Sequence, residues 1–250
     1  MPVISGPPRA VYATAVETLA GSVVRALTGA DDAFQLAGQL VAEGSPAECR
    51  ARLAAVRVLG PDALAPFALA GHQFGPEDAE VVETGSQMFP TSELDPDATD
   101  DPDNTVLVRA LRDWATGEVL TRLGVAGSAR AYPARPGASV GPDQGWLAWV
   151  GVLAQLSPLA TPGLDGPLHA DARRYRLDVA RGVTRAMLRR DYLTAARLAR
   201  WLASGGEVPM DPPFAVEPVL RQLELVAGAD PRLQLEIAIA RYGLGGGAGE

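Results

Sequence analysis

The arginines between residues 171 and 200 are the side chains whose type and spacing most clearly suggest chemistry. This stretch contains nine arginines and three aspartates. A guanidinium stays charged at physiological pH and binds a carboxylate or phosphate through two parallel hydrogen bonds. At about 100° per residue, four arginines fall within about 80° of one another on one predicted helix, and two more share a side of the next helix. These candidate anion- or partner-binding residues are Arg174, Arg181, Arg185, Arg189, Arg197 and Arg200.

Three interpretations of this predicted arginine band stay open. It is a solvated helix face, or it pairs internally with residues 58–108, or it binds another molecule, either a protein or a small anionic ligand. Residues 58–108 contain eleven acidic residues and no arginine. All 22 basic residues of the chain are arginine, which indicates codon bias in a GC-rich bacterial genome, so that only arginine placement carries information. The net charge of −8 opposes binding to nucleic acid.

The acidic segment around residues 95–103 invites comparison with cation-binding loops. A calcium-binding loop of the EF-hand type that begins at Asp95 would need glycine and glutamate where this chain has Asp100 and Val106. Two prolines, Pro96 and Pro102, interrupt any helix that could align the aspartates. The sequence therefore favours an exposed acidic linker, with a weak Mg²⁺ or Ca²⁺ site as the alternative, and predicts no cofactor.

An enzyme is the alternative to a binding protein. His72 could form an acid/base pair with Glu77 or Glu80, and Trp146 and Trp149 could line a pocket between helices. The loops at 85–104 or 124–145 would close that pocket. Neither histidine of the chain has the spacing of a helical metal site, and no nucleophile, phosphate-loop or dinucleotide motif occurs.

Apolar periodicity predicts helices that could position these residues. Tyr12, Val16, Leu19, Val23 and Leu27 recur at helical spacing before Gly29, which can end that helix. Ser45-Pro46-Ala47-Glu48 combines a capping serine with a glutamate three residues later, as at the start of many helices. Helices are predicted at 31–43, 46–59, 61–70, 76–84, 105–123, 146–156, 170–189, 191–204, 215–227 and 231–243. The apolar run at 146–156 predicts a central buried helix.

The predicted fold is all-α, a helical bundle or a stack of antiparallel helical hairpins with two long irregular loops. We expect an N-terminal helical subdomain at 1–84, an acidic proline-rich linker or loop at 85–104, a C-terminal bundle at 105–243 and a disordered tail at 244–250. The N-terminus lacks the basic start and apolar run of a signal peptide, and no apolar stretch reaches about 18 residues. The sequence thus predicts a cytoplasmic protein with no membrane partner.

The favoured function is a binding or accessory protein that recognises its partner through the arginine band. A DNA-binding regulator is a weaker alternative, in which 31–43 and 46–59 form a helix-turn-helix with Glu48, Arg50 and Arg52 near the start of the second helix. Gly44 lies about three residues later than a tight turn of that motif requires. Substrate, partner and oligomeric state do not follow from the sequence.

Overall fold

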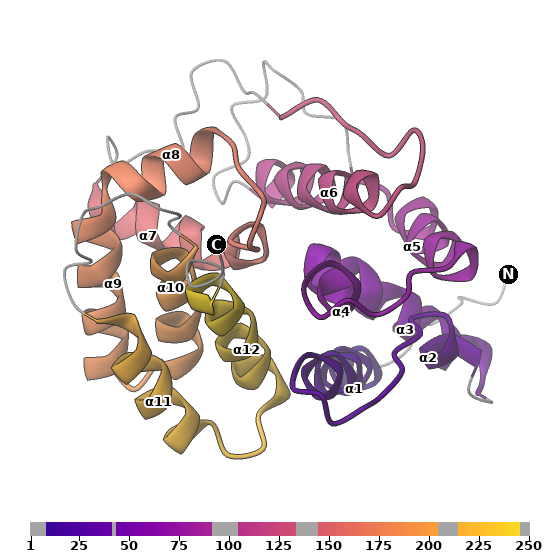
Figure 1. The fold of residues 1–250 in the computed structure, drawn as a ribbon, viewed down its shortest axis with the longest axis horizontal. Helices are drawn as coiled ribbons and strands as arrows, with labels where there is room; N and C mark the ends of the chain where they lie inside the picture. Colours follow the sequence, from indigo (N-terminus) through magenta and orange to yellow (C-terminus); the bar gives the residue numbers. More distant parts are fainter. Residues whose placement is uncertain (1–8, 42–43, 92–104, 134–144, 205–214, 246–250) are drawn as a thin grey trace, which may run out of the picture.

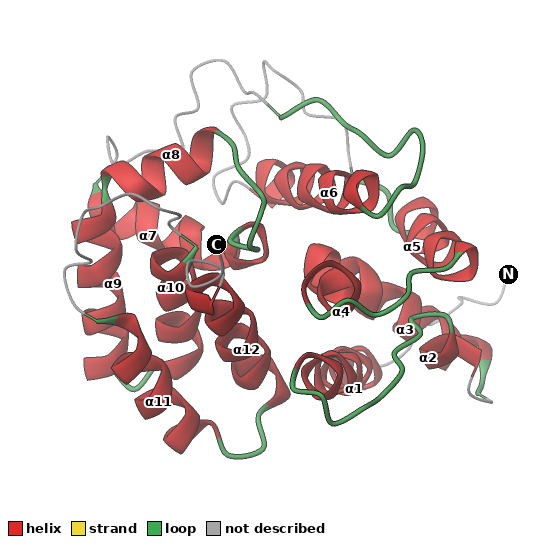
Figure 2. Ribbon diagram, in the orientation of Figure 1, coloured by secondary structure: helices red, strands yellow, loops and turns green. Residues whose placement is uncertain are grey.

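The computed structural model describes residues 9–41, 44–91, 105–133, 145–204 and 215–245. Over these ranges the chain is all-α, with helices packed against one another and no β-strand (Figures 1 and 2). The helices are α1 (Arg9–Leu27), α2 (Gly38–Val41), α3 (Pro46–Leu59), the 3-10 helix η1 (Gly60–Leu64), α4 (Ala65–Leu69), α5 (Pro76–Met88), α6 (Thr105–Arg122), α7 (Trp146–Gln155), the 3-10 helix η3 (Ser157–Leu159), α8 (Pro167–Arg174), α9 (Arg176–Leu188), α10 (Tyr192–Ala203), α11 (Val216–Ala227) and α12 (Pro231–Gly245).

The N-terminal helices form where the sequence predicts them. Helix α1 buries four of the five predicted apolar residues, all but the half-buried Tyr12, and Gly29, which follows the helix, has a φ of 72°. At the start of α3, the Ser45 side chain accepts a hydrogen bond from the Glu48 backbone N–H while the Glu48 carboxylate accepts one from the Ser45 N–H. This capping box satisfies two backbone donors that no intrahelical partner can reach, and it confirms the predicted start of the helix.

Helix α10 is the centre of the C-terminal half and packs against α7, α9, α11 and α12. Short connections make α9 and α10 one hairpin and α11 and α12 another, consistent with the predicted stack. Gly182 of α9 sits where a side chain would not fit, because a Cβ atom there would lie 2.8 Å from Leu198 of α10 and 3.3 Å from Val150 of α7. This glycine allows the close approach of the three helices.

The two halves of the described chain share one hydrophobic core. In Figure 1, α1 to α5 lie on one side of the molecule, α7 to α12 on the other, and α6 runs along the top. Helix α1 packs against both α3 and α12, so the first and last described helices are neighbours. The division into a subdomain at 1–84 and a bundle at 105–243 stays a prediction.

Several predicted boundaries differ from the structure. The helix predicted at 31–43 is only the four residues of α2, and α5 continues to Met88 into the predicted linker. The helix predicted at 170–189 is interrupted at Tyr175, whose ring packs edge-on against Trp149. Helix α7 is not central, since Leu147 is exposed on its outer side. Residues 244 and 245 belong to α12, while 92–104, 134–144 and 246–250 lie outside the described residues.

Candidate functional site

One face of α9 combines exposed leucines with arginines. Leu177 and Leu188 are 56% and 82% exposed, although most leucines of the described chain are in the core. Between and beside them lie Arg181, Arg185 and Arg189, and together these side chains border an open surface hollow of about 520 Å³. We call these five residues the basic–apolar face of α9.

The arginines of this face are largely free to bind. Arg181 donates to Asp178 on the same helix at 2.9 Å, an exposed pair of the kind that contributes little to stability. Arg185 and Arg189 form no ion pair with any residue that the structure describes. Because a guanidinium is a rigid fork of donors, the two unpaired arginines can each hold a carboxylate of a partner.

The turn that follows α9 adds a further basic residue that the predicted band did not include. Arg190 is exposed and has a φ of 58°, the left-handed conformation that usually selects glycine at the end of a helix. Its backbone N–H donates to the Met187 carbonyl, and the next N–H, of Asp191, donates to the Ala186 carbonyl. A local sequence pattern gives no sign of this turn, because arginine is an unusual residue for it.

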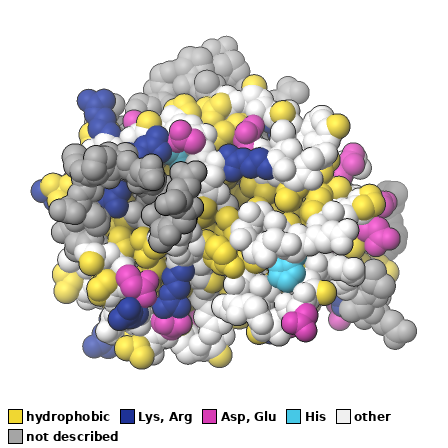
Figure 3. All heavy atoms as spheres, in the orientation of Figure 1, with side chains coloured by type: hydrophobic (Ala, Val, Ile, Leu, Met, Phe, Trp, Pro, Cys, Tyr) yellow, Lys and Arg dark blue, Asp and Glu magenta, His cyan; other side chains and the backbone are white. Residues whose placement is uncertain are grey.

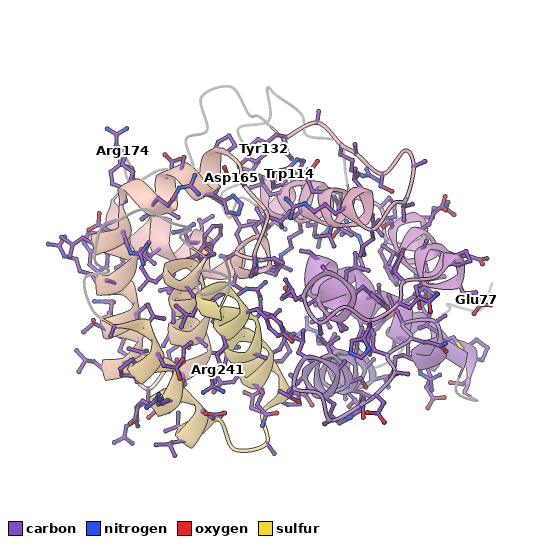
Figure 4. All side chains as sticks on the ribbon, in the orientation of Figure 1. Glu77, Trp114, Tyr132, Asp165, Arg174 and Arg241 are labelled. Atoms are coloured by element: carbon purple, nitrogen blue, oxygen red, sulfur yellow. The ribbon has the colours of Figure 1, made fainter. Side chains whose placement is uncertain are left out.

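Arg174 is exposed but belongs to a different helix. It ends α8, whose axis changes direction at Tyr175, so a single helical wheel over 170–189 wrongly groups it with the arginines of α9. Its guanidinium lies 5.4 Å from the centre of the Tyr175 ring, and the side chain projects from the upper left of the molecule in Figure 4. Arg174 is therefore beside the basic–apolar face and not part of it.

Arg200 contradicts the predicted arginine band most clearly. Its side chain is 0% exposed, whereas the prediction placed it on a solvent-facing side of α10 together with Arg197. Arg197 is mostly buried and lies 3.4 Å from Glu236 of α12. The prediction is wrong for Arg200 because α10 has neighbouring helices on all sides, so even its polar side faces the protein interior.

Arg200 is the centre of a buried charge cluster formed with Asp62, Glu236 and Arg197. Its guanidinium donates to both oxygens of Asp62, at 2.6 and 3.0 Å, and to Glu236 Oε2 at 3.0 Å. Three neutral oxygens of η3 and the residues after it accept its remaining hydrogen bonds, the carbonyls of Pro158 at 3.3 Å and Ala160 at 3.1 Å and the Thr161 hydroxyl at 2.8 Å. Two cations and two anions balance, and nearly every donor has a partner, as a buried charge requires.

The protonation behaviour of the cluster follows from its burial. Burial raises the pKa of the Asp62 carboxyl, and the facing Arg200 guanidinium offsets only part of that rise. Burial lowers the pKa of Arg200, but Asp62 and Glu236 outweigh this effect and leave it raised overall. Arg200 therefore stays charged at every physiological pH and holds η1, η3, α10 and α12 together rather than an external ligand.

Internal pairing between the acidic segment and the arginines occurs at one described point, the bond of Asp62 to Arg200. The acidic residues of α5 lie elsewhere, and Figure 4 shows Glu77 and Arg174 projecting from opposite sides of the molecule. On the face seen in Figure 3, basic and acidic side chains over α11 and α12 are adjacent, in agreement with the Arg241–Glu224 and Arg221–Glu217 pairs. Whether residues 92–104 shield the basic–apolar face is outside the described structure.

Two of the residues named for an enzyme, His72 and Trp149, have structural contacts, and His72 lines a surface hollow together with Glu77. His72 Nε2 lies 3.2 Å from the Ala26 carbonyl, and its ring packs near Phe34. Trp149 is buried in the core against Tyr175, where its indole N–H has no partner among the described residues. Within the described ranges, no three His, Cys, Asp or Glu side chains converge as a metal site would require.

A polar hollow of about 520 Å³ between α3, α5 and α6 offers a second place for chemistry. Asp113 is one of the carboxylates that line it, but Arg57 contacts both oxygens of Asp113, and the Thr91 hydroxyl donates to one of them at 2.7 Å. A general base needs a free lone pair that points at the proton it removes. Asp113 has both oxygens occupied, so this hollow gives little support to catalysis.

The helix-turn-helix arrangement is absent from the segment where it was considered. Helix α2 has four residues, which is too short to support a recognition helix, and Arg50 of α3 lies over the Phe89 ring at 5.5 Å. Glu48 is held in the capping box, and Arg52 donates to the Leu40 carbonyl. Glu48 and Arg52 thus contribute to local structure at the start of α3.

None of the described helices combines the length and the apolar character that a membrane-spanning helix needs.

Comparison with known proteins gives no relative. No protein-family model, no curated protein and no solved structure matches the chain, so the geometry described above is the basis for its function.

Proposed function

We propose that this chain is a cytoplasmic binding protein that recognises an acidic segment of a partner protein through the basic–apolar face of α9. The observation that carries the proposal is the exposure of Leu177 and Leu188 beside Arg185 and Arg189, which form no ion pair within the described part of the chain. Large exposed apolar side chains next to charges are typical of protein interaction sites. The enzyme and DNA-binding alternatives are less favoured, because Asp113 is paired with Arg57 and α2 has only four residues.

The spacing of the leucines favours a protein over a small anion. Leu177 and Leu188 are eleven residues apart, which corresponds to about 16 Å along a helix and three turns. A phosphate or small carboxylate would engage one or two arginines and leave both leucines in water. An acidic amphipathic helix could cover both leucines with its apolar side and place carboxylates at Arg185 and Arg189.

A defined peptide tests this proposal without knowledge of the natural partner. The probe is a fluorescein-labelled helical peptide with leucines at positions 1, 4, 8 and 11 and glutamates beside them, measured by fluorescence anisotropy at low and high salt. We expect saturable binding that weakens with salt, and a loss of about tenfold in the variant R185Q/R189Q, since exposed charge contacts contribute up to about 1 kcal/mol each.

The control is R221Q on α11, where an exposed arginine pairs with Glu217 away from the basic–apolar face. It should bind the peptide like the unchanged protein. The proposal would be contradicted if R185Q/R189Q and R221Q bound the peptide with the same affinity. It would also be contradicted if the unchanged protein bound a peptide with lysines in place of the glutamates equally well. The variant L177S/L188S separates recognition of a protein from capture of a small anion. It should lose affinity for the peptide, whereas binding of inorganic phosphate, the comparison ligand, does not need the leucines.

A further inference from the structure

A groove between α1 and α3 lies on the other side of the molecule from α9 (Figure 1). Its floor is formed by the buried side chains of Leu19 on α1 and Ala51, Ala55 and Val56 on α3, and Leu40 of α2 forms one wall. The cavity has a volume of about 370 Å³, within the range of pockets that hold small molecules. We call it the α1–α3 groove.

We infer that the α1–α3 groove binds a small uncharged molecule with an apolar chain or ring and one hydrogen-bonding group. The apolar part of the ligand follows from the floor. Alanines at 15, 51 and 55 leave a space between the two helices that leucines would fill, and the buried floor of this space is apolar. A ligand that fills the space removes its own apolar surface from water.

The hydroxyl groups of Thr14 and Thr18 supply the hydrogen-bonding part. They stand one turn apart on α1 and line the groove. The hydroxyls of Thr28, Thr116, Thr121 and Thr184 all bond to the carbonyl four residues earlier, as is common in helices. Those of Thr14 and Thr18 form no such bond within the described chain, so each can donate to or accept from a ligand.

Gln39 adds a donor that its surroundings orient. Its Oε1 lies 3.0 Å from the hydroxyl of Ser22, which is buried and also accepts a hydrogen bond from Arg25 at 3.1 Å. The carbonyl end of the amide is thus directed at Ser22. The Nε2 end is left to donate into the groove, which Gln39 lines.

The charges at the rim argue for an uncharged ligand. Glu48 and Arg52 lie together at the rim and have opposite signs. The Glu48 carboxylate accepts from the Ser45 N–H at 2.7 Å, and Arg52 donates to the Leu40 carbonyl at 3.2 Å. Glu48 would repel an anion that Arg52 attracts, and Arg52 would repel a cation that Glu48 attracts. A charged ligand of either sign therefore gains little from the pair.

The test uses 1-octanol as the probe, with binding to the full-length protein followed by calorimetry and by saturation-transfer NMR. The variant Ala15→Leu fills the groove, and Ala13→Leu makes the same change on an exposed side of α1 that does not border it. We expect saturable binding, a reduction of at least tenfold in A15L and no change in A13L. Equal affinities in A15L and A13L, or no saturable binding, would overturn the inference.

Two further variants keep the test decisive. If A15L loses its helical circular dichroism, Thr14→Trp covers the groove from its exposed rim and should reduce octanol binding in the same way. Thr18→Val preserves shape but removes a hydroxyl, so it should weaken 1-octanol several-fold and leave toluene unchanged. Equal loss for both probes in T18V would show that the hydroxyl does not select the ligand and would overturn that part of the inference. The basic–apolar face takes no part, so L177S/L188S should bind octanol normally.

Discussion

The Arg200 guanidinium meets two carboxylates and three neutral oxygens in a site with no access to water. A buried guanidinium needs a hydrogen-bond acceptor for each of its donors, because an unpaired charge in the interior costs several kcal/mol. The nearest partner along the chain is 36 residues away and Asp62 is 138 residues away. The burial of Arg200 therefore depends on tertiary structure and not on the sequence of its own helix.

Replacing Arg200 by Met should be strongly destabilising. The variant leaves Asp62 and Glu236 facing each other in the interior, and we expect the free energy of unfolding to fall by about 3–5 kcal/mol. Arg221→Met, which removes an exposed pair, should cost less than about 0.5 kcal/mol. Urea denaturation of the two variants measures the difference, and similar losses would show that the buried charge cluster is not a major source of stability.

His169 should make stability depend on pH. Burial lowers its pKa, and Nε2 donates to the Leu159 carbonyl at 2.9 Å while Nδ1 is buried without a described partner. Below about pH 6.5, the unfolded chain takes up a proton that the folded protein does not, so the free energy of unfolding falls with acidification, by up to about 1.4 kcal/mol per pH unit.

The measurement is the slope of unfolding free energy against pH from 7 to 5, in the unchanged protein and in His169→Gln. The slope should be smaller in H169Q. Asp62 acts in the opposite direction, because its raised pKa makes the folded protein the stronger proton binder, but it is present in both proteins and cancels in the comparison. Identical slopes would mean that the pKa of His169 is the same in the folded and unfolded protein, and would contradict the prediction.

At the scale of the helix, two glycines in similar positions should respond oppositely to alanine. A Cβ at Gly117 of α6 would lie 2.4 Å from the backbone oxygen of Ser128, whereas a Cβ at Gly151 of α7 would meet nothing within 4 Å. We expect G117A to lose about 1–3 kcal/mol through overpacking and G151A to gain about 0.5–1 kcal/mol through reduced entropy of the unfolded chain. Thermal unfolding separates them, and a stabilised G117A would show that the segment after α6 shifts freely.

Helix formation was predictable where local rules decide it. The stripe of α1 and the capping box of α3 need only neighbours within a few residues, and both are present. The break at Tyr175 depends on Trp149, and the burial of Arg200 depends on Asp62, so no local pattern contains either. The candidate site was predictable in part, because Arg181, Arg185 and Arg189 lie on one face, while Leu177, Leu188 and Arg190 were missed.

At the scale of the molecule, the contact of α1 with α12 and the bond of Asp62 to Arg200 connect the two predicted domains. We therefore expect them to unfold together. All four tryptophans lie in the C-terminal segment, so their fluorescence reports on that segment, whereas far-ultraviolet circular dichroism reports on all helices. The two signals should give one urea midpoint. Independent domains would instead give a dichroism curve with two steps, of which only the second coincides with the change in fluorescence.

Arg190 has a consequence for how this protein evolves. It is the one non-glycine residue with positive φ in the described chain, and that conformation costs an L-residue about 1 kcal/mol that glycine does not lose. A single base change converts a CGN arginine codon into a GGN glycine codon, so the substitution of Arg190 by glycine is readily reached by mutation. Selection for a positive charge at the end of α9 would keep arginine at this position even though glycine would make the turn more stable.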